Sequence, residues 1–409
     1  MIKEKVSFEQ IEEFLQGRDP QKYIVGIEAT YYENFVSLIV NDPVKGKRVE
    51  QHAYKPFLWL KHEVSQHIYG GNRREIKKAM NLYGVKLNKV RSEDSNGITP
   101  KRFENGYNFM AVCKKGSYSK LIQFFKAGGV DIFNEKHKKM FVAFPPAEQF
   151  LIQTGKRLFK GMDDYNDVHR FQFDLETEGL KASVDPIFQI GIKDNKGFEL
   201  VLETKGDTPQ KRRDSERINI IKFFELIDEI RPDLISGYNS ENFDWPYFKR
   251  RCERLGIDIE VIAKTLNPDK KIYWRDSMLK LGGESQAYQQ TSMWGYNILD
   301  ISHSVRRAQA INSNIKSWSL KYITQYSGVA KPNRVYVPGD KLHTIWSDTN
   351  PYWFNDTDGS WGVIGERGLP KGSVEVKGDY IVQRYLIDDL WETEQIDVIY
   401  NQAAYLIAK

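Results

Sequence analysis

Cysteine is scarce in this sequence and long apolar runs are missing, and both absences narrow the possible functions. Only Cys113 and Cys252 occur among 409 residues, and neither has a Cys or His neighbour at the spacing of zinc ligands. We therefore expect two buried thiols and no zinc site. No stretch approaches 18 uncharged apolar residues, so we expect no membrane span. The first residues mix charges of both signs, unlike a signal peptide, which favours a cytoplasmic protein.

The composition is that of a soluble globular protein. Hydrophobic residues make up 40% and charged residues 28% of the chain, and its length predicts two or three domains. The net charge is +5, and 13% of the residues are aromatic. Because the bases of a single strand are often held on aromatic faces beside Lys and Arg, this mixture permits a nucleic-acid partner without requiring one.

The first part of the chain, residues 1–155, predicts a smaller α+β domain. Its strand at residues 54–60 contains Pro56, which lacks a backbone N–H and therefore favours the edge of a sheet. A polar stretch at about 154–167 is typical of a linker. The other elements expected in this part are a hairpin formed by residues 23–28 and 35–40 and a basic helix at about 73–83.

The second part, residues 165–409, predicts an α/β domain in which helices flank a mixed sheet. The chain is therefore α/β in its second part and α+β overall. Composition shifts towards Gly, Pro, Trp, Asn and Asp at about 327–377, which indicates an insertion or a small subdomain. The expected elements are a strand at 171–176, a hairpin formed by 187–192 and 198–202, a helix from about 215 to 231, a strand at 234–238, and a C-terminal helix over 379–409.

Three short acidic clusters follow one another in this second part. The first is Phe-Asp-Leu-Glu-Thr at residues 173–177, where a strand would place Asp174 and Glu176 on the same face. Asp-x-Glu is a weak motif by itself, since it also occurs at Asp214/Glu216 and Asp258/Glu260. We expect the former to cap a helix, and the latter lies in the wrong order relative to the second cluster.

The second cluster, Asn-Ser-Glu-Asn-Phe-Asp at residues 239–244, follows a short apolar strand. Asp244 precedes Trp-Pro, which is typical of a helix start, so it would lie where sites commonly form at the carboxyl ends of strands. A simple helix cap is the alternative for Asp244. Asn239 would either fix the turn or contact a substrate, and Phe243 would belong to the core or touch DNA.

The third cluster is Tyr-Leu-Ile-Asp-Asp at residues 385–389. Tyr-x-x-x-Asp puts both side chains on one face only in a helix. The pair Tyr385/Asp389 lies in an uninterrupted helical stretch, whereas Asp388 is rotated about 100° away. The chain contains three competing pairs in less helical surroundings: Tyr296/Asp300, Tyr336/Asp340 and Tyr352/Asp356.

Four carboxylates gathered in this way suit two hard divalent cations, Mg²⁺ or Mn²⁺. We expect Asp174 to bridge both ions, Glu176 and Asp389 to complete the first site, and Asp244 to hold the second ion largely through water. Tyr385 would orient an attacking water. This equipment predicts a metal-dependent phosphodiester hydrolase.

In this order, the three clusters resemble the Exo I, Exo II and Exo III motifs of DEDD-type exonucleases, and the tyrosine of the third marks the DEDDy branch. The stretches at 173–177 and 235–247 are similar to the proofreading domain of family B DNA polymerases, especially those of T4-like phages. Ile-Leu-Asp-Ile at 298–301 and Trp-Ser-Leu-Lys-Tyr-Ile at 318–323 are also similar to stretches of that family. The resemblance covers residues 165–409 well and the N-terminal region faintly.

The resemblance implies an RNase H-like 3'-5' exonuclease that removes nucleotides from single-stranded DNA 3' ends during replication, in a phage-infected or bacterial cytoplasm. The palm, fingers and thumb motifs of the family are absent, so the resemblance implies a polymerase domain or subunit outside this sequence as partner, and it allows a sliding clamp as well. Asp356-Thr-Asp358 lacks the neighbours of a polymerase motif.

Two other functions remain open at this point: a free-standing DEDDy exonuclease that acts on RNA, and a DNA-binding or polymerase-docking module without catalysis. A basic and aromatic stretch containing Lys271, Trp274 and Arg275 would either follow the DNA strand or form ordinary surface.

Overall fold

A computed structural model describes residues 19–89, 106–107, 109–114, 116–366 and 368–408. The chain divides into two compact units, Met1–Gly161 and Met162–Lys409. The division falls inside the polar stretch at 154–167, from which the sequence predicts a linker. Each unit has its own sheets and core, and each is described by itself.

Unit 1 is built on two small sheets. The first has the order β1-β2-β3 (Ile24–Ala29, Phe35–Asp42, Gly46–Ala53), and the second has the order β5-β6-β4-β7 (Val85–Lys89, Phe109–Cys113, Phe57–Leu60, Phe141–Val142). Its helical segments are α2 (His62–His67), η1 (Ile68–Gly71), α3 (Arg73–Tyr83), α4 (Tyr118–Ala127), α5 (Glu135–Lys138) and α6 (Pro146–Thr154). The predicted hairpin is confirmed as the antiparallel pair β1 and β2, and the predicted basic helix as α3.

The predicted edge position of the strand around Pro56 is wrong. Strand β4 begins at Phe57 and lies between β6 and β7, inside its sheet. Pro56 precedes the paired residues, so its missing N–H interrupts no ladder bond, while its carbonyl accepts a hydrogen bond from the backbone N–H of Cys113 at 2.8 Å. Proline thus marks where this strand starts.

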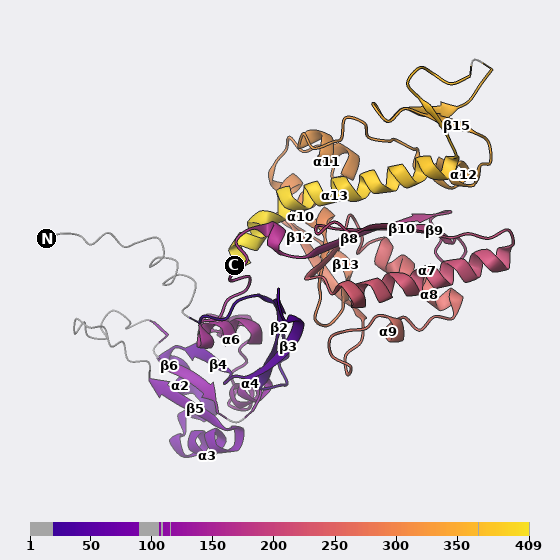
Figure 1. Cartoon of the computed structure of the whole chain (residues 1–409). Helices are drawn as coiled ribbons and strands as arrows, with labels where there is room; N and C mark the ends of the chain where they lie inside the picture. The colour runs from indigo at the N-terminus through magenta and orange to yellow at the C-terminus, as the bar shows by residue number, and fades with distance from the viewer. Residues whose placement is uncertain (1–18, 90–105, 108, 115, 367, 409) are drawn as a thin grey trace. The chain divides into compact units, whose positions relative to one another are not determined.

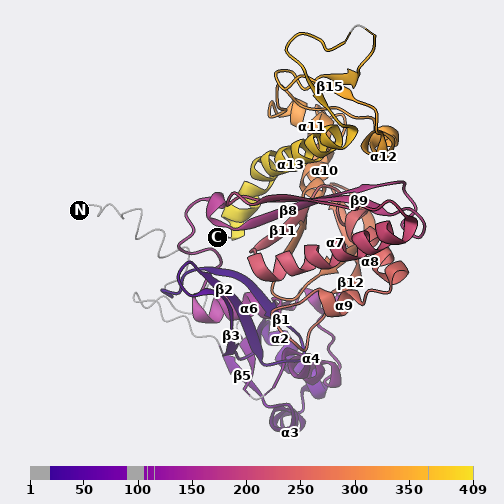
Figure 2. The same cartoon turned by 45° about the vertical axis from the view of Figure 1, so that its right-hand side comes forward.

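Unit 2 is organised by a five-stranded mixed sheet with the order β10-β9-β8-β11-β14 (Glu199–Glu203, Ile187–Asp194, Arg170–Thr177, Leu234–Gly237, Asn297–Asp300). Strands β8, β11 and β14 are parallel. The sequence predicts the β9–β10 hairpin, in which β9 pairs antiparallel with both β8 and β10. In both views, helix α13 (Gly378–Ala408) covers one face of this sheet, and α7 (Pro209–Ile230) and α8 (Asp244–Leu255) cover the other (Figure 1, Figure 2).

Strand β8 alternates as predicted. Phe171 and Phe173 pack with Phe223 of α7, with ring centroids 6.0 and 5.0 Å apart, on the apolar face. The alternate residues Gln172, Asp174 and Glu176 therefore face the side covered by α13. The polar face is thus an internal face of the molecule, and it points its carboxylates at a helix.

Helix α7 begins earlier than predicted, at Pro209, where the hydroxyl oxygen of Thr208 accepts a hydrogen bond from the N–H of Lys211 at 3.2 Å. Asp214 and Glu216 consequently lie inside the helix, and the prediction that they cap its start is wrong. Asp214 is exposed and Glu216 is buried.

The remaining parts of unit 2 surround the sheet. A long hairpin, β12 (Tyr273–Leu281) with β13 (Glu284–Ser292), was missed by the sequence analysis because its strands are largely polar on both faces. Residues 327–377 contain a small sheet ordered β16-β15-β17 (Trp361–Val363, Tyr352–Phe354, Val374–Val376). The other helical segments are η3 (Tyr165–Asp167), α9 (Ile259–Ile262), α10 (Ile301–Ile311), α11 (Leu320–Tyr326), η4 (Gly339–Lys341) and α12 (Leu342–Ser347).

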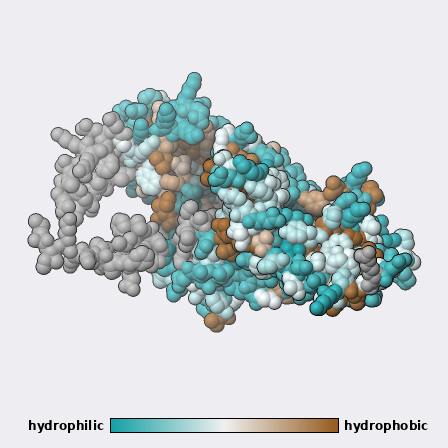
Figure 3. Space-filling model, turned by 90° about the horizontal axis from the view of Figure 1, so that it is seen from above, coloured by the Kyte–Doolittle hydropathy of each residue, from teal (hydrophilic) through white to brown (hydrophobic). Residues whose placement is uncertain are grey.

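The face shown in Figure 3 is mostly hydrophilic, with small scattered hydrophobic patches. Within the described ranges, no helix combines the length and the apolar character needed to cross a bilayer.

Candidate active site

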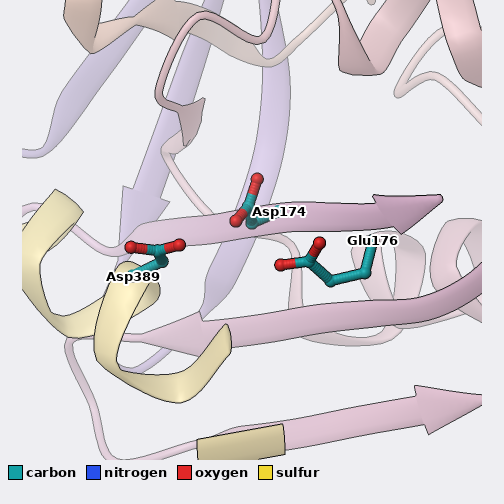
Figure 4. Close-up of side chains that lie close together, drawn as sticks. All are labelled: Asp174, Glu176 and Asp389. Carbon is teal, nitrogen blue, oxygen red and sulfur yellow. The ribbon is translucent and has the colours of Figure 1, made fainter. Parts of the chain in front are cut away.

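Three carboxylates meet between strand β8 and helix α13. Ligand atoms of Asp174, Glu176 and Asp389 all lie within 4.8 Å of one another. Figure 4 shows the two strand residues beside Asp389 of the helix, with their carboxylates grouped in the space between the two elements. The i,i+2 spacing on a strand and a single residue of a crossing helix thus produce one acidic centre.

A glycine allows the helix to come this close. Gly191 of β9 is paired with Asp174 in the sheet register. A Cβ atom at Gly191 would lie 2.7 Å from Cγ of Leu386 and 2.9 Å from Cδ1 of Leu390, so any larger residue would push α13 away from the sheet. The contact at Gly191 therefore sets the distance between Asp389 and the carboxylates of β8.

Asp244 reaches the same site from another direction. It lies in the first turn of α8, directly after the turn that follows β11, and only 2% of its surface is exposed. Its Oδ1 has no hydrogen-bond partner among the described residues. Although Asp244 lies outside the group of three, it lines the same cleft, so all four predicted carboxylates border one space.

The turn before Asp244 is fixed by another buried acid. Asn239 adopts a left-handed backbone with φ of 64°, and its N–H donates to Oδ1 of Asp300 at 2.9 Å. The N–H of Glu241 donates to Oδ2 of Asp300 at 3.1 Å. Asp300, a member of a competing Tyr-x-x-x-Asp pair, thus braces the turn and does not line the cleft.

The cleft has a volume of about 320 Å³. It combines the four carboxylates with three aromatic residues, a lysine and polar groups of the turn. The lysine is Lys321, whose Nζ donates to the hydroxyl oxygen of Tyr385 at 2.7 Å and lies 4.5 Å from the centre of that ring. The lining residues are Asp174, Leu175, Glu176, Tyr238, Asn239, Phe243, Asp244, Ser319, Leu320, Lys321, Tyr385, Asp389 and Thr393.

Burial and mutual repulsion disfavour the charged forms of these acids. Burial, followed by the charge of Asp389, raises the pKa of Asp174 to about 8. Burial and the neighbouring Asp174 also raise the pKa values of Glu176 and Asp244 well above their ordinary range. For Asp389, burial raises the pKa, while the Arg334 guanidinium and then Lys321 oppose the shift.

These residues fit divalent metal ions. Every candidate ligand atom is a carboxylate oxygen, the donor that Mg²⁺ and Mn²⁺ prefer, and a buried oxygen of Asp244 is unpartnered by the described residues. A cation bound between these carboxylates would reduce the repulsion between their negative charges. The donor set indicates a hard cation and leaves its identity and number open.

The sequence did not predict a functional role for two individual residues, Lys321 and Arg334. Lys321 lies in a stretch quoted for its resemblance to the polymerase family, yet nothing in its local pattern predicts the contact with Tyr385. Arg334 lies in the segment at 327–377 and pairs with Asp389 over a long sequence distance. Only the fold could reveal these two cations.

The residues suggested for weak DNA contact separate into two groups. Asn239 and Phe243 line the cleft. Lys271, Trp274 and Arg275 do not line it, because they belong to the β12–β13 region and its approach. Their partners lie elsewhere: Lys271 pairs with Glu260 at 2.8 Å, Lys249 lies over the Trp274 ring at 4.7 Å, and Arg275 binds Gln290.

Comparison with known proteins finds a match over the part of the chain that holds three of the four acids. The family model described as DNA polymerase family B, exonuclease domain, matches residues 160–323, which include Asp174, Glu176 and Asp244. A DNA polymerase of Thermococcus kodakarensis is 34% identical over 118 residues, which cover 28% of this chain and 7% of that protein. DNA polymerase 2 of Aeropyrum pernix is 25% identical over 169 residues, which cover 41% of this chain and 17% of that protein.

A solved structure shows a similar fold over a longer stretch of the chain. The structure of the family B DNA polymerase from the hyperthermophilic archaeon Pyrobaculum calidifontis matches 92% of this chain with a TM-score of 0.55 and 16% identity, and 45% of that chain is covered. The mixed α/β architecture agrees with the predicted RNase H-like exonuclease fold. Both sequence relatives are archaeal, so the T4-like phage subgroup stays a prediction.

The matches cover 7% and 17% of the two sequence relatives and 45% of the Pyrobaculum chain, which is less than half of each polymerase. The family model ends at residue 323 and therefore does not reach Tyr385 or Asp389. Within these bounds, residues 160–323 are similar to the exonuclease domain of family B DNA polymerases.

Proposed function

We propose that this chain is a metal-dependent 3'-5' exonuclease that removes nucleotides from single-stranded DNA 3' ends. The observation that carries the proposal is the group of Asp174, Glu176 and Asp389, whose ligand atoms lie within 4.8 Å of one another at a cleft. The match of residues 160–323 to an exonuclease domain supports the same chemistry. A cleft of about 320 Å³ is at the small end for ligand pockets, which favours a strand end over a duplex.

In this proposal, Asp174, Glu176 and Asp389 would hold one divalent ion, and Asp174 and Asp244 would hold a second. When bound, such ions lower the pKa of an attacking water and stabilise the leaving 3'-oxygen. The carboxylates must be ionised to bind them, and their raised pKa values make binding compete with protons.

Tyr385 is proposed to orient the attacking water. Burial, followed by the charge of Asp389, raises the pKa of its hydroxyl, so the group stays protonated and remains able to donate a hydrogen bond. Lys321 holds the hydroxyl oxygen from one side, which fixes the direction of the phenol. Phe243 and Leu320, which also line the cleft, offer apolar surface to the terminal base or sugar.

The wider role proposed for the activity is proofreading, with the polymerase palm, fingers and thumb supplied by another domain or subunit. The RNA exonuclease and the non-catalytic docking module are less favoured. The family match is to a DNA polymerase domain, and a docking module would have no use for four acids gathered at one cleft.

The test is digestion of a 5'-labelled single-stranded DNA with Mg²⁺ or Mn²⁺, comparing the wild type with Asp174→Ala. We expect a ladder that shortens from the 3' end, present only with metal and lost in the variant. A matched RNA oligonucleotide run in parallel decides between substrates. Cleavage without metal, or undiminished cleavage by the variant, would reject the proposed function.

A further inference from the structure

A buried arginine contacts the third acidic cluster from outside the cleft. Arg334 is 3% exposed and comes from the segment at 327–377. Its guanidinium pairs with Asp389, lies 3.1 Å from Glu392 and 3.9 Å from Asp388, and lies 5.0 Å from the centre of the Tyr385 ring. One side chain therefore touches both proposed functional residues of helix α13.

The backbone around this arginine is fastened to the same helix. The N–H of Val335 donates to Oδ2 of Asp388 at 3.0 Å, and Nζ of Lys331 donates to Oδ1 of the same carboxylate at 2.8 Å. Arg334 itself donates to the carbonyl oxygens of Val335 at 2.8 Å and of Tyr385 at 3.2 Å. The two bonds that Arg334 itself donates leave the guanidinium little freedom to turn away from Asp389.

Arg334 is not among the residues that line the cleft, whereas Asp389 and Tyr385 both are. The guanidinium therefore contacts Asp389 without bordering the cleft in which the proposed metal and substrate would lie. A carboxylate has two oxygens, so one can be held by Arg334 while the other faces Asp174 and Glu176. In this arrangement, the arginine does not take the place of a metal ion.

We propose that Arg334 is a positioning residue that holds the Asp389 carboxylate and the Tyr385 ring in the geometry needed for metal binding and water orientation. The proposal rests on the metal site of the proposed function. Partners that hydrogen-bond a ligating carboxylate restrict its orientation, and losing one typically costs about 10–100-fold in metal affinity or activity. The segment at 327–377 thus acquires a role, because it delivers this side chain.

The test measures Mn²⁺ affinity directly, by electron paramagnetic resonance of free Mn²⁺, in the wild type, Arg334→Met and Arg334→Lys. We expect Arg334→Met to weaken the tightest site by about 10-fold or more. Arg334→Lys keeps the charge without the planar fork, so it should recover part of the loss. Lys331→Met is the matched control. It removes another basic side chain of the same segment, which among the described acids pairs with Asp388. The variant should keep Mn²⁺ affinity within about twofold of the wild type.

The outcomes separate this proposal from the proposed function. Equal Mn²⁺ affinity in Arg334→Met and the wild type would mean that the arginine only supports the fold, and tighter binding would mean that it repels the ion; both overturn the positioning role. If Arg334→Met does not fold, Arg334→Lys decides by the same criterion. Mn²⁺ binding without DNA cleavage by the wild type would reject the nuclease and leave the positioning role intact, whereas a wild type that binds no Mn²⁺ would reject both.

Discussion

The motif Asp-x-Glu occurs three times in the chain, and two of its structural settings, a strand and a long helix, can be compared directly. On strand β8, Asp174 and Glu176 share one face and meet Asp389. In helix α7, two residues apart means opposite directions, so Asp214 is exposed while Glu216 is buried. The same motif therefore gives two acids on one face in strand β8 and a single buried acid in helix α7.

The two regions also differ in how the charge of their buried carboxylates is neutralised. Glu216 receives two hydrogen bonds from Arg251, at 2.7 and 2.6 Å, and a third from the N–H of Ile187 at 2.9 Å. Among the residues that the structure describes, no arginine pairs with Asp174 or Glu176, and burial raises the pKa values of both acids. Removing one partner of a buried acid–arginine pair destabilises a fold, whereas buried acids without an arginine are typical of a site that binds a cation.

The largest effect expected from this comparison concerns catalysis. Asp174→Asn should lower the single-turnover rate of DNA cleavage by about 10⁴-fold, equivalent to roughly 5.5 kcal/mol of transition-state stabilisation, because it removes the proposed bridging ligand. Glu216→Gln, assayed per folded molecule, should cleave at nearly the wild-type rate. Equal losses in the two variants would remove the distinction between the regions.

The second prediction concerns the third cluster. Asp389→Ala should reduce cleavage by about 10³-fold, or roughly 4 kcal/mol, since it removes a ligand of the acidic centre. Asp300→Ala should reduce it only mildly, because Asp300 braces the turn through the N–H groups of Asn239 and Glu241. Rapid-quench assays of both variants check this, and the reverse order would show that the other Tyr-x-x-x-Asp pair is functional.

The third prediction concerns stability. Glu216→Gln should lower the free energy of unfolding by about 3 kcal/mol, since it leaves the buried guanidinium of Arg251 without its counter-ion. Urea denaturation followed by circular dichroism measures the loss. Asp174→Asn serves as the control, and a loss as large as that of Glu216→Gln would contradict the account.

The fourth prediction concerns pH. The pKa of folded Asp174 is about 8, above the ordinary value of 3.8. Between these values the folded state holds a proton that the unfolded state has lost, so stability falls as pH rises through this window. Without metal, the Tm of Asp174→Asn relative to the wild type should therefore increase by roughly 10 °C from pH 5.5 to pH 8.5. A difference in Tm that stays constant over that pH range would mean that Asp174 is ordinarily ionised.

The smallest effect is expected at Asp214. It has the same place in the Asp-x-Glu of helix α7 that Asp174 has in the Asp-x-Glu of strand β8. Its side chain is exposed and accepts a single hydrogen bond, from Gln210 at 2.9 Å. Asp214→Ala should change the free energy of unfolding by less than about 0.5 kcal/mol and leave cleavage unchanged. A clear loss in either measurement would show that the motif matters outside its strand setting.

Local patterns predicted much of unit 2. The alternation on β8, the hairpin of β9 and β10, and a long C-terminal helix follow from residue periodicity and are confirmed. The start of α7 was misplaced because Thr208 and Pro209, which cap and begin it, lie before the apolar stripe on which the prediction relied.

What the sequence could not supply are contacts between distant segments. Arg334 meets Asp389 across 55 residues, and Gly191 sets the approach of α13 because Leu386 happens to pack over it. Neither residue belongs to a motif, and their importance depends on which strand or helix lies opposite. The acids of the site were predictable by residue type and spacing, whereas the basic side chains that contact them were not.

The most direct test of the central claim is the anomalous scattering of Mn²⁺ in crystals of the wild-type chain. The account predicts Mn²⁺ among Asp174, Glu176 and Asp389, the three acids whose ligand atoms lie within 4.8 Å, and no Mn²⁺ at Glu216 and Arg251. An empty acidic centre at saturating Mn²⁺, or equal density at both places, would contradict it.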